Sequence, residues 1–199
     1  MAGNGRQHLD IPLAPGETLT FGVISDTHVP DRQLRISPKI KEIFREARVS
    51  LILHAGDVAT PAVLKELGEI SPVTAVRGNR DWVFGRALPM EVEIRAGDVV
   101  VGMTHGHGGL LPYFIDKFNF LSQGYHAERY QRFARRVFPD ARVIIYGHTH
   151  YPDNTWKDGV LYFNPGAAGM PAHGVLGPSV GLLTVGPGAR VDARIVPLE

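Results

Sequence analysis

The sequence contains no cysteine among its 199 residues, so no disulfide can form and any metal ion must be held by nitrogen and oxygen ligands. It also lacks an apolar run near the ~20 residues of a membrane-spanning helix, and residues 1–16 contain no apolar core of the kind found in signal peptides. Excess charge of one sign is missing too: the formal net charge is +1, whereas general binders of nucleic acids or membrane surfaces carry concentrated basic charge. We therefore expect a cytoplasmic protein that binds no membrane and forms no stable complex with nucleic acids.

The chain is long enough for one domain with a sizeable core. Residues 1–16 are polar and rich in glycine and proline, which predicts a flexible N-terminal tail before a single domain over 17–199. Residues 108–140 differ from the rest in their aromatic and arginine content, and we expect an excursion there with a helix over about 125–137. The simplest interpretation is an amphipathic helix with solvated arginines; the alternatives are a lid over a site or a surface for homo-oligomer formation.

Apolar strands and amphipathic helices alternate in the first half of the chain. Strands are expected at 18–25, 49–53 and 73–77, and helices begin at Ser37-Pro38 and Thr60-Pro61, where a capping residue precedes a proline. This β-α-β-α-β order predicts parallel strands with right-handed crossovers. Further strands are predicted at 91–95, 99–103, 141–146, 154–157, 160–163, 180–185 and 190–196. The pattern indicates an α/β fold of two stacked mixed sheets flanked by helices.

Oxygen and imidazole ligand types follow the expected strands at the points where each strand ends. They are Asp26, His28, Asp57, Asn79, His105, His148 and His150. Parallel sheets carry their sites at the carboxyl ends of their strands, and His148 and His150 point the same way if their backbone stays extended. These ligands are too many for one catalytic ion with an open position but suit two ions that share a bridging carboxylate. Such a ligand set fits manganese, iron, nickel or zinc.

These residues stand in the order of the motifs of the calcineurin-like metallophosphoesterases, which the chain resembles from about Thr18 onward. The motifs are Asp26-x-His28, Gly56-Asp57, Gly78-Asn79, His105 and Gly147-His148-x-His150. The segment Ile24-Ser25-Asp26-Thr27-His28, the modest length and Asn164-Pro165-Gly166 resemble the small YfcE-type phosphodiesterases within that superfamily. The resemblance implies a four-layer αββα sandwich and two divalent ions per chain, with manganese favoured.

The resemblance also implies residue roles. Asp26, His28, Asp57 and His150 would hold one ion, and Asp57, Asn79, His105 and His148 would hold the other. A hydroxide that bridges the two ions would attack the phosphorus of a small phosphoester in line, with Asp57, Asn79, Arg80 and His105 in the catalytic group. The expected activity is phosphodiester hydrolysis; the alternatives are a phosphomonoesterase or nucleotide phosphatase, and a non-catalytic scaffold like the retromer subunit of this fold.

Two positions depart from the superfamily pattern. Many members continue Gly-Asn with a histidine that can donate a proton, whereas this chain has Arg80 followed by Asp81. An arginine stays protonated, so it clamps anions rather than donating protons, and we expect Arg80 to contact phosphoryl oxygens; the alternative is a surface ion pair with Asp81. Ala167 stands where relatives often have serine, which removes a hydroxyl group. Among the other histidines, His107 is a candidate substrate contact, and His54 is expected to be a buried neighbour of Asp57.

Overall fold

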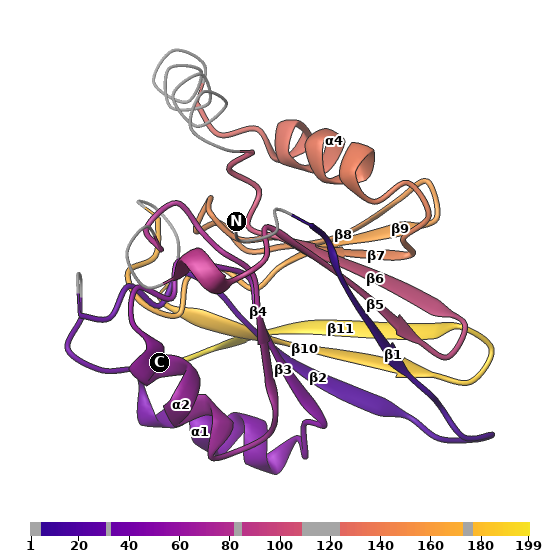
Figure 1. The fold of residues 1–199 in the computed structure, drawn as a ribbon, viewed down its shortest axis with the longest axis horizontal. Coiled ribbons are helices and arrows are strands. Elements are labelled where there is room, and N and C mark those ends of the chain that lie inside the picture. The colour runs from indigo at the N-terminus through magenta and orange to yellow at the C-terminus, as the bar shows by residue number, and fades with distance from the viewer. Residues whose placement is uncertain (1–4, 31–32, 82–84, 109–123, 173–176) are drawn as a thin grey trace.

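The computed structural model describes residues 5–30, 33–81, 85–108, 124–172 and 177–199. Two mixed β-sheets lie face to face at its centre (Figure 1). The larger sheet consists, in spatial order, of β1 (Gln7–Ile11), β5 (Glu91–Ala96), β6 (Val99–Thr104), β7 (Val143–Ile145), β9 (Val160–Asn164) and β8 (Asp153–Lys157). The smaller sheet consists of β11 (Arg190–Pro197), β10 (Ser179–Gly186), β2 (Leu19–Ile24), β3 (Leu51–His54) and β4 (Val73–Ala75). The described helices are α1 (Pro38–Glu46), α2 (Pro61–Gly68), α4 (Ala127–Val137) and the short 3-10 helix η1 (Gly85–Ala87).

Three apolar layers hold four layers of secondary structure together. The middle layer fills the space between the two sheets, with Phe21 of β2 and Val101 of β6 among its members. A second layer lies between the smaller sheet and helices α1 and α2, and includes Phe44. The third layer, with Phe138, lies between the larger sheet and α4. Figure 1 shows α1 and α2 below the sheets and α4 above them, so the expected αββα sandwich is confirmed.

Glycines within three central strands make room for three phenylalanine rings. A Cβ atom on Gly22 of β2 would lie 3.0 Å from ring atoms of Phe44, and one on Gly181 of β10 would lie 2.5 Å from Phe163. A Cβ atom on Gly102 of β6 would overlap the ring of Phe138, which follows α4. The close packing of α1 and α4 on their sheets therefore depends on missing side chains.

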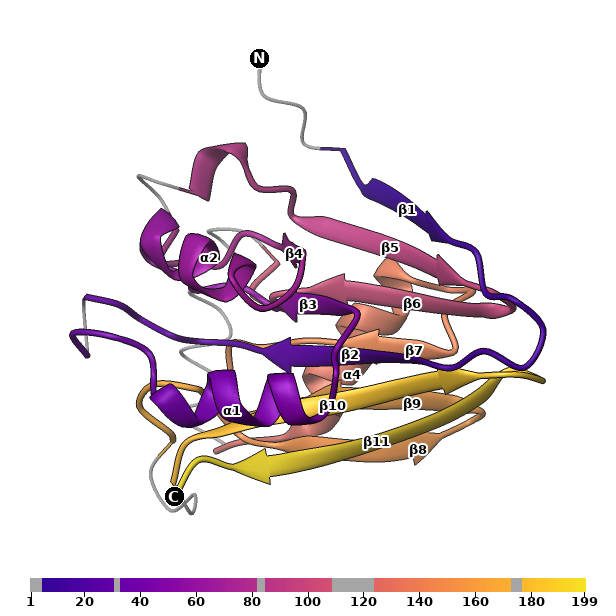
Figure 2. The ribbon, with the colours of Figure 1, turned by 90° about the horizontal axis from the view of Figure 1, so that it is seen from below.

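The strand directions bring the ends of the predicted strands to one edge of the molecule. In the smaller sheet β2, β3 and β4 run parallel, and in the larger sheet β6, β7 and β9 do so. Figure 2 shows the arrowheads of β2, β3 and β6 at the same end. The loops after these strands carry the candidate ligands, so the fold gathers ligands from both sheets.

The prediction of a flexible tail over residues 1–16 is wrong for residues 7–11, because they form β1, which pairs in parallel with β5. Leu9 and Ile11 pack against the middle apolar layer. Arg6 bonds to Glu91 and Glu93, each at 3.2 Å, and its guanidinium lies 4.8 Å from the ring centroid of Phe138. The alternating Leu9, Ile11 and Leu13 carried a strand signal that the glycine and proline content obscured.

The expected helices and hairpins are present, with boundaries shifted by a few residues. Thr60 caps α2 by accepting the Ala62 N–H at 3.4 Å, whereas the side chain of Ser37 makes no capping hydrogen bond to α1. In the excursion, α4 is amphipathic and buries Tyr130, Gln131 and Ala134. Residues 109–123 lie outside the described part, so the choice between lid and interface stays a prediction.

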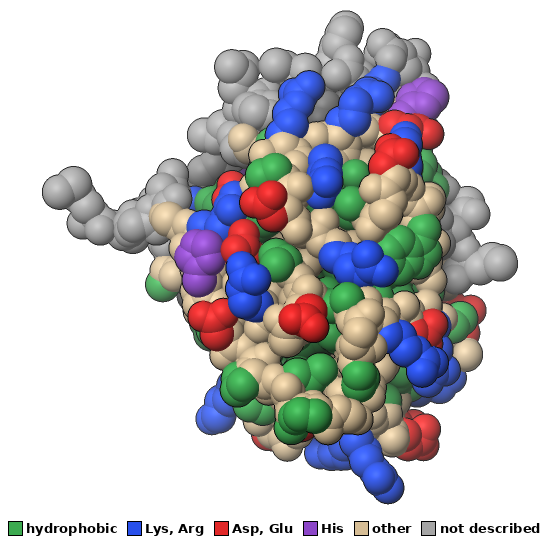
Figure 3. All heavy atoms as spheres, turned by 90° about the vertical axis from the view of Figure 1, so that its right-hand side faces the viewer, with side chains coloured by type: hydrophobic (Ala, Val, Ile, Leu, Met, Phe, Trp, Pro, Cys, Tyr) green, Lys and Arg blue, Asp and Glu red, His purple; other side chains and the backbone are tan. Residues whose placement is uncertain are grey.

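Charge is mixed over the surface seen in Figure 3. Lysine and arginine side chains alternate there with aspartate and glutamate, and apolar side chains are scattered among them. Among the described residues, no helix combines the length and apolar character that crossing a membrane requires.

We expect Gly102→Ala to lower the free energy of unfolding by about 1–3 kcal/mol, because the new methyl group forces the Phe138 ring and α4 away from the sheet. Urea denaturation of both proteins measures the change. Gly68→Ala is the matched control: nothing lies within 4 Å of its added Cβ atom at the end of α2, so its free energy of unfolding should stay equal or rise. Equal stability of Gly102→Ala and the natural protein would contradict this packing account.

Candidate metal centre

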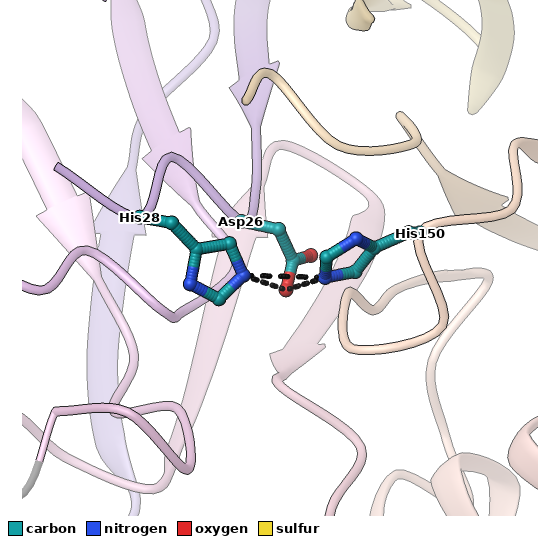
Figure 4. Close-up of side chains that lie close together, drawn as sticks. All are labelled: Asp26, His28 and His150. Atoms are coloured by element: carbon teal, nitrogen blue, oxygen red, sulfur yellow. Dashed lines mark hydrogen bonds and ion pairs between the residues drawn. The ribbon is translucent and has the colours of Figure 1, made fainter. Parts of the chain in front are cut away.

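A buried carboxylate between two imidazoles forms the first part of the site. Nε2 of His150 lies 3.3 Å and Nε2 of His28 lies 3.8 Å from Oδ1 of Asp26, and the two Nε2 atoms are 3.2 Å apart. Figure 4 shows both rings turned toward this carboxylate from opposite sides. Asp26 follows β2, and His150 lies in the loop after β7, so the two sheets meet here.

The second part of the site surrounds Asp57 and Asn79. Oδ1 of Asp57 lies 3.4 Å from Nε2 of His105, and Oδ2 of Asp57 lies 3.7 Å from Nε2 of His28. Oδ1 of Asn79 lies 3.0 Å from Nε2 of His105 and 2.9 Å from Nδ1 of His148. The carboxylate of Asp57 therefore lies between the two parts, and the structure brings all seven predicted ligands into one cluster.

The outer nitrogens of two histidine rings are held by main-chain carbonyls. Nδ1 of His105 lies 2.7 Å from the carbonyl oxygen of Ala55, and Nδ1 of His150 lies 2.7 Å from that of Met170. Each Nδ1 therefore carries the proton, which leaves Nε2 with its lone pair directed into the cluster. This carbonyl support is the usual way in which proteins orient a metal-binding imidazole.

Most of the candidate ligands have left-handed backbone conformations. The φ angles are 53° at Asp26, 50° at His28, 54° at Asp57, 69° at His148 and 60° at His150. The backbone at His148 and His150 is therefore not extended, which was the condition for both side chains to point the same way, although both still reach the same cluster. Each such residue costs on the order of 1 kcal/mol or more, and clusters of strained residues are typical of functional sites.

The glycines of the ligand motifs are required by close contacts. A Cβ atom on Gly78 would overlap the carboxylate of Asp57, and one on Gly147 would overlap the hydroxyl of Ser25. Gly56 has a φ of 96°, and a Cβ atom there would lie 2.6 Å from Nδ1 of His105. Each motif thus places a bare backbone against a ligand from another strand.

The two carboxylates differ in their electrostatic surroundings. Burial raises the pKa of Asp26, but contact with His150 and the positive charge that His105, His150 and His28 carry when doubly protonated outweigh burial, so its pKa is below the ordinary value. Burial raises the pKa of Asp57 above its ordinary value, against the opposing influence of His105. Further positive charge beside Asp57 would stabilise its ionised form.

The donor set fits a divalent ion. Oδ1 of Asp26 is buried and has no hydrogen bond of normal geometry among the described residues, while Oδ2 accepts from Ser25 at 2.6 Å and from the His148 N–H at 3.0 Å. An ionised oxygen without a bonded proton is costly to bury. Imidazole and carboxylate donors lie within 4.8 Å of one another in two groups, Asp26-His28-His150 and Asp26-Asp57-His105. A bound ion would accept the free lone pairs of the ligand atoms in both groups.

Asp81 holds the loop that carries Asn79 and Arg80. Its side chain is 2% exposed, and its oxygens accept the N–H groups of Ala59 at 2.8 Å and Gly78 at 2.7 Å. The alternative of an Arg80–Asp81 surface pair is therefore wrong. Arg80 is exposed, and its main-chain N–H donates to Oδ1 of Asp57 at 2.7 Å.

Two further histidines lie near the ligands: His54 supports the ligand loops, and His107 has its ring beside the ligand rings. His54 is fully buried; its Nδ1 accepts the Gly56 N–H at 3.3 Å, so its Nε2 donates to Oγ1 of Thr27 at 3.2 Å. The His107 ring centroid lies 5.4 Å from that of His105, and its Nδ1 is buried without a hydrogen bond among the described residues. Burial, followed by the charges of His105, His148 and Arg77, lowers the pKa of His107 to about 3, so this ring is neutral at physiological pH. Its contact with substrate stays a prediction.

Sequence reasoning missed several residues that hold the ligands. Ser25 donates to Asp26, Thr27 links the two ligand loops through a 3.2 Å bond to the carbonyl oxygen of Val58, and Asp81 fixes the Asn79 loop. None has a local signature apart from its position beside a ligand motif. Ala167, which departs from the pattern of relatives, is buried and bonds through its carbonyl oxygen to the Ser179 N–H at 3.0 Å.

Comparison with known proteins identifies the arrangement. The model of the calcineurin-like phosphoesterase superfamily domain matches residues 19–187. The chain belongs to this superfamily. A "Probable metallophosphoesterase" of Methanothermobacter thermautotrophicus is 33% identical over 178 residues, which cover 89% of this chain and 92% of the relative.

Other proteins resemble the chain more distantly. A "Phosphodiesterase" of Methanocaldococcus jannaschii is 27% identical over 164 residues, which cover 79% of this chain and 92% of the relative. Among solved structures, wild-type Vps29 of Entamoeba histolytica complexed with zinc superposes with a TM-score of 0.65 at 22% identity, covering 91% of this chain and 100% of that one. The fold is therefore shared by proteins with different names, and the family of this chain is one of metal-dependent phosphoesterases without a shown substrate.

We expect the free energy of unfolding to fall as the pH is lowered from about 6.5 to 4, in part through His54. Burial lowers the pKa of His54 to about 4 from an ordinary value of 6.5, against the opposing charges of Asp81 and Asp26. Between these values the unfolded chain binds a proton that the folded chain does not, so stability is full above 6.5 and is lost toward 4. Denaturation of metal-free protein at several pH values measures this dependence.

His54→Gln is the comparison variant, because glutamine retains an amide and does not titrate. The free energy of unfolding of this variant should change less with pH than that of the natural protein, the slopes differing by up to about 1.4 kcal/mol per pH unit. The same slope in both proteins would contradict the assignment of this dependence to His54.

Proposed function

We propose that this chain is a metal-dependent phosphodiesterase with two divalent ions per chain, manganese being the favoured metal. The main support is the convergence of four imidazoles and one amide around two buried carboxylates, one of which keeps an oxygen without a hydrogen bond among the described residues. Asp26, His28, Asp57 and His150 would hold one ion, and Asp57, Asn79, His105 and His148 the other. The relative named a phosphodiesterase supports the choice of diesters.

The ions, when bound, would supply an acidified water and neutralise charge on the phosphoryl group. The chain's own contribution is orientation: main-chain carbonyls fix the rings of His105 and His150, and the Arg80 N–H and the Gly78 contact fix Asp57. A site with rigid ligands needs little reorganisation when charge develops in the transition state.

Arg80 carries a positive charge but no transferable proton. Its side chain is exposed, and it stands at the position after Gly-Asn where many members of the superfamily have a histidine. We propose that it contacts phosphoryl oxygens, while the departing oxygen takes its proton from water or leaves as an anion. Substrates with good leaving groups, such as aryl diesters, are therefore favoured.

The second candidate is a protein-interaction scaffold, which the likeness to Vps29 favours. A complete set of ligand residues supports the enzyme instead. A scaffold would need no Asp57 carboxylate for its interactions, so the two candidates make different predictions for the same variants.

We expect removal of metal by a chelator to abolish hydrolysis of bis(p-nitrophenyl) phosphate, and manganese to restore it better than nickel, zinc or magnesium. The diester should have a higher kcat/KM than p-nitrophenyl phosphate. Release of p-nitrophenolate measures both activities, and calorimetry measures the number of bound ions. Asp57→Asn should fold and lack turnover, because its amide cannot replace the shared carboxylate.

The possible results separate the alternatives. Absence of hydrolysis with all four metals, in protein that binds two ions, would favour the scaffold. A higher kcat/KM for the monoester would indicate a phosphomonoesterase. Turnover by folded Asp57→Asn would contradict the proposed metal site.

We expect Arg80→Ala to lower kcat on the diester by about 10²–10³-fold, since a charged contact to the phosphoryl group is lost. Arg80→Lys should lie between the two proteins, because lysine keeps the charge and loses the planar fork. Steady-state kinetics measures kcat. Manganese affinity is the internal control: it should not change, because Arg80 bonds to Asp57 through the main chain. Unchanged kcat in Arg80→Ala would exclude the phosphoryl contact.

A further inference from the structure

Asn164 occupies a buried position between the two loops that carry and support the histidines of the 147–150 segment. It is the last residue of β9, which lies beside β7 in the larger sheet, and its side chain is 0% exposed. It is not among the predicted ligands, and both its side-chain nitrogen and its side-chain oxygen form hydrogen bonds.

The amide nitrogen of Asn164 holds the loop that contains both histidines. Nδ2 donates to the carbonyl oxygen of Gly147 at 3.0 Å and to Oγ1 of Thr149 at 3.1 Å. These two acceptors flank His148 in the sequence. The Thr149 N–H also donates to the Gly147 carbonyl oxygen at 2.7 Å, so the bonds close a compact turn around the His148 backbone.

The amide oxygen of Asn164 holds the neighbouring loop, residues 166–170. Oδ1 accepts the Gly166 N–H at 2.9 Å. Farther along this loop, the Gly169 N–H donates to the carbonyl oxygen of Asp26 at 3.2 Å, and the Met170 carbonyl oxygen meets Nδ1 of His150 at 2.7 Å. One buried amide thus joins the backbone that carries His148 to the backbone that orients His150.

The geometry around His148 and His150 needs such a restraint. Both residues have left-handed φ angles, 69° and 60°, which residues with side chains leave readily when nothing holds them. The side-chain NH2 group of Asn164 donates to one loop, and its side-chain oxygen accepts from the other. Only a correctly oriented amide satisfies both loops.

We propose that Asn164 is a positioning residue that fixes His148 and His150 for metal binding. This inference rests on the proposed function, in which these two histidines are metal ligands. In this proposal Asn164 touches neither ion nor substrate. It sets the conformation of the backbone that carries the ligand side chains.

The test is manganese binding by chelator-stripped protein, measured by calorimetry, for the natural protein and for Asn164→Asp. Aspartate has the same shape but places an oxygen, without protons at neutral pH, against the carbonyl oxygen of Gly147. We expect manganese affinity to fall at least tenfold, the scale on which loss of ligand-orienting partners acts. Asn154→Asp is the matched control: Asn154 is exposed and its Nδ2 also donates to a carbonyl, that of Ala193 at 2.9 Å. Its manganese affinity should match the natural protein.

Substitutions at Thr149 keep the test decisive if Asn164→Asp does not fold. Thr149→Val has the same shape without the hydroxyl that accepts from Asn164, and should weaken manganese binding severalfold. Thr149→Ser keeps the hydroxyl and should restore it. Equal affinity of Thr149→Val and Thr149→Ser would overturn the proposal.

A merely structural role has a different signature. It would lower the thermal midpoint of metal-free Asn164→Asp while the folded protein bound manganese as tightly as the natural one, and this result would overturn the proposal. Failure of the proposed function is distinguishable, since the natural protein would then bind manganese without hydrolysing the diester. A natural protein that bound no manganese would overturn both.

Discussion

The carboxylate of Asp57 is the interaction on which the site depends. One oxygen accepts the Arg80 N–H and lies beside His105, and the other faces His28. These partners come from the ends of different strands in two different sheets. A single buried charge therefore connects both sheets at their carboxyl edge, and the missing side chain of Gly78 gives it the room to do so.

Packing elsewhere serves this edge. The middle apolar layer sets the separation of the two sheets, and the outer layers hold α1, α2 and α4, with rings of Phe44 and Phe138 packed against strand glycines under α1 and α4. A shift of one sheet against the other would separate Asp26 from His150, because they belong to different sheets. A rigid core therefore keeps the ligand atoms of the two sheets at fixed distances from one another.

Much of this architecture could be predicted from the sequence, and the failures have physical reasons. Runs such as β3 (Leu51–His54) are largely buried, so their apolar composition indicates strands without tertiary information, and polar residues after them mark the site edge. The left-handed backbone at His148 and the roles of Asp81, through Ala59, and of Asn164 depend on groups distant in the sequence. No local pattern records a hydrogen bond to a residue 17 positions away. Strand β1 was hidden because its apolar residues are few and its partner β5 lies about 80 residues farther along.

Strand β1 also replaces β5 as the edge strand of the larger sheet. Without β1, strand β5 would be the edge of the larger sheet and would offer a free row of backbone groups to any neighbouring chain. Arg6, which precedes β1, forms ion pairs with Glu91 and Glu93 of β5, so ionic contacts help to hold the new edge strand on the sheet. Because β1 pairs with a strand 85 residues farther along the chain (Gln7 with Val92), its contacts have a high sequence separation, and contacts of that kind slow folding.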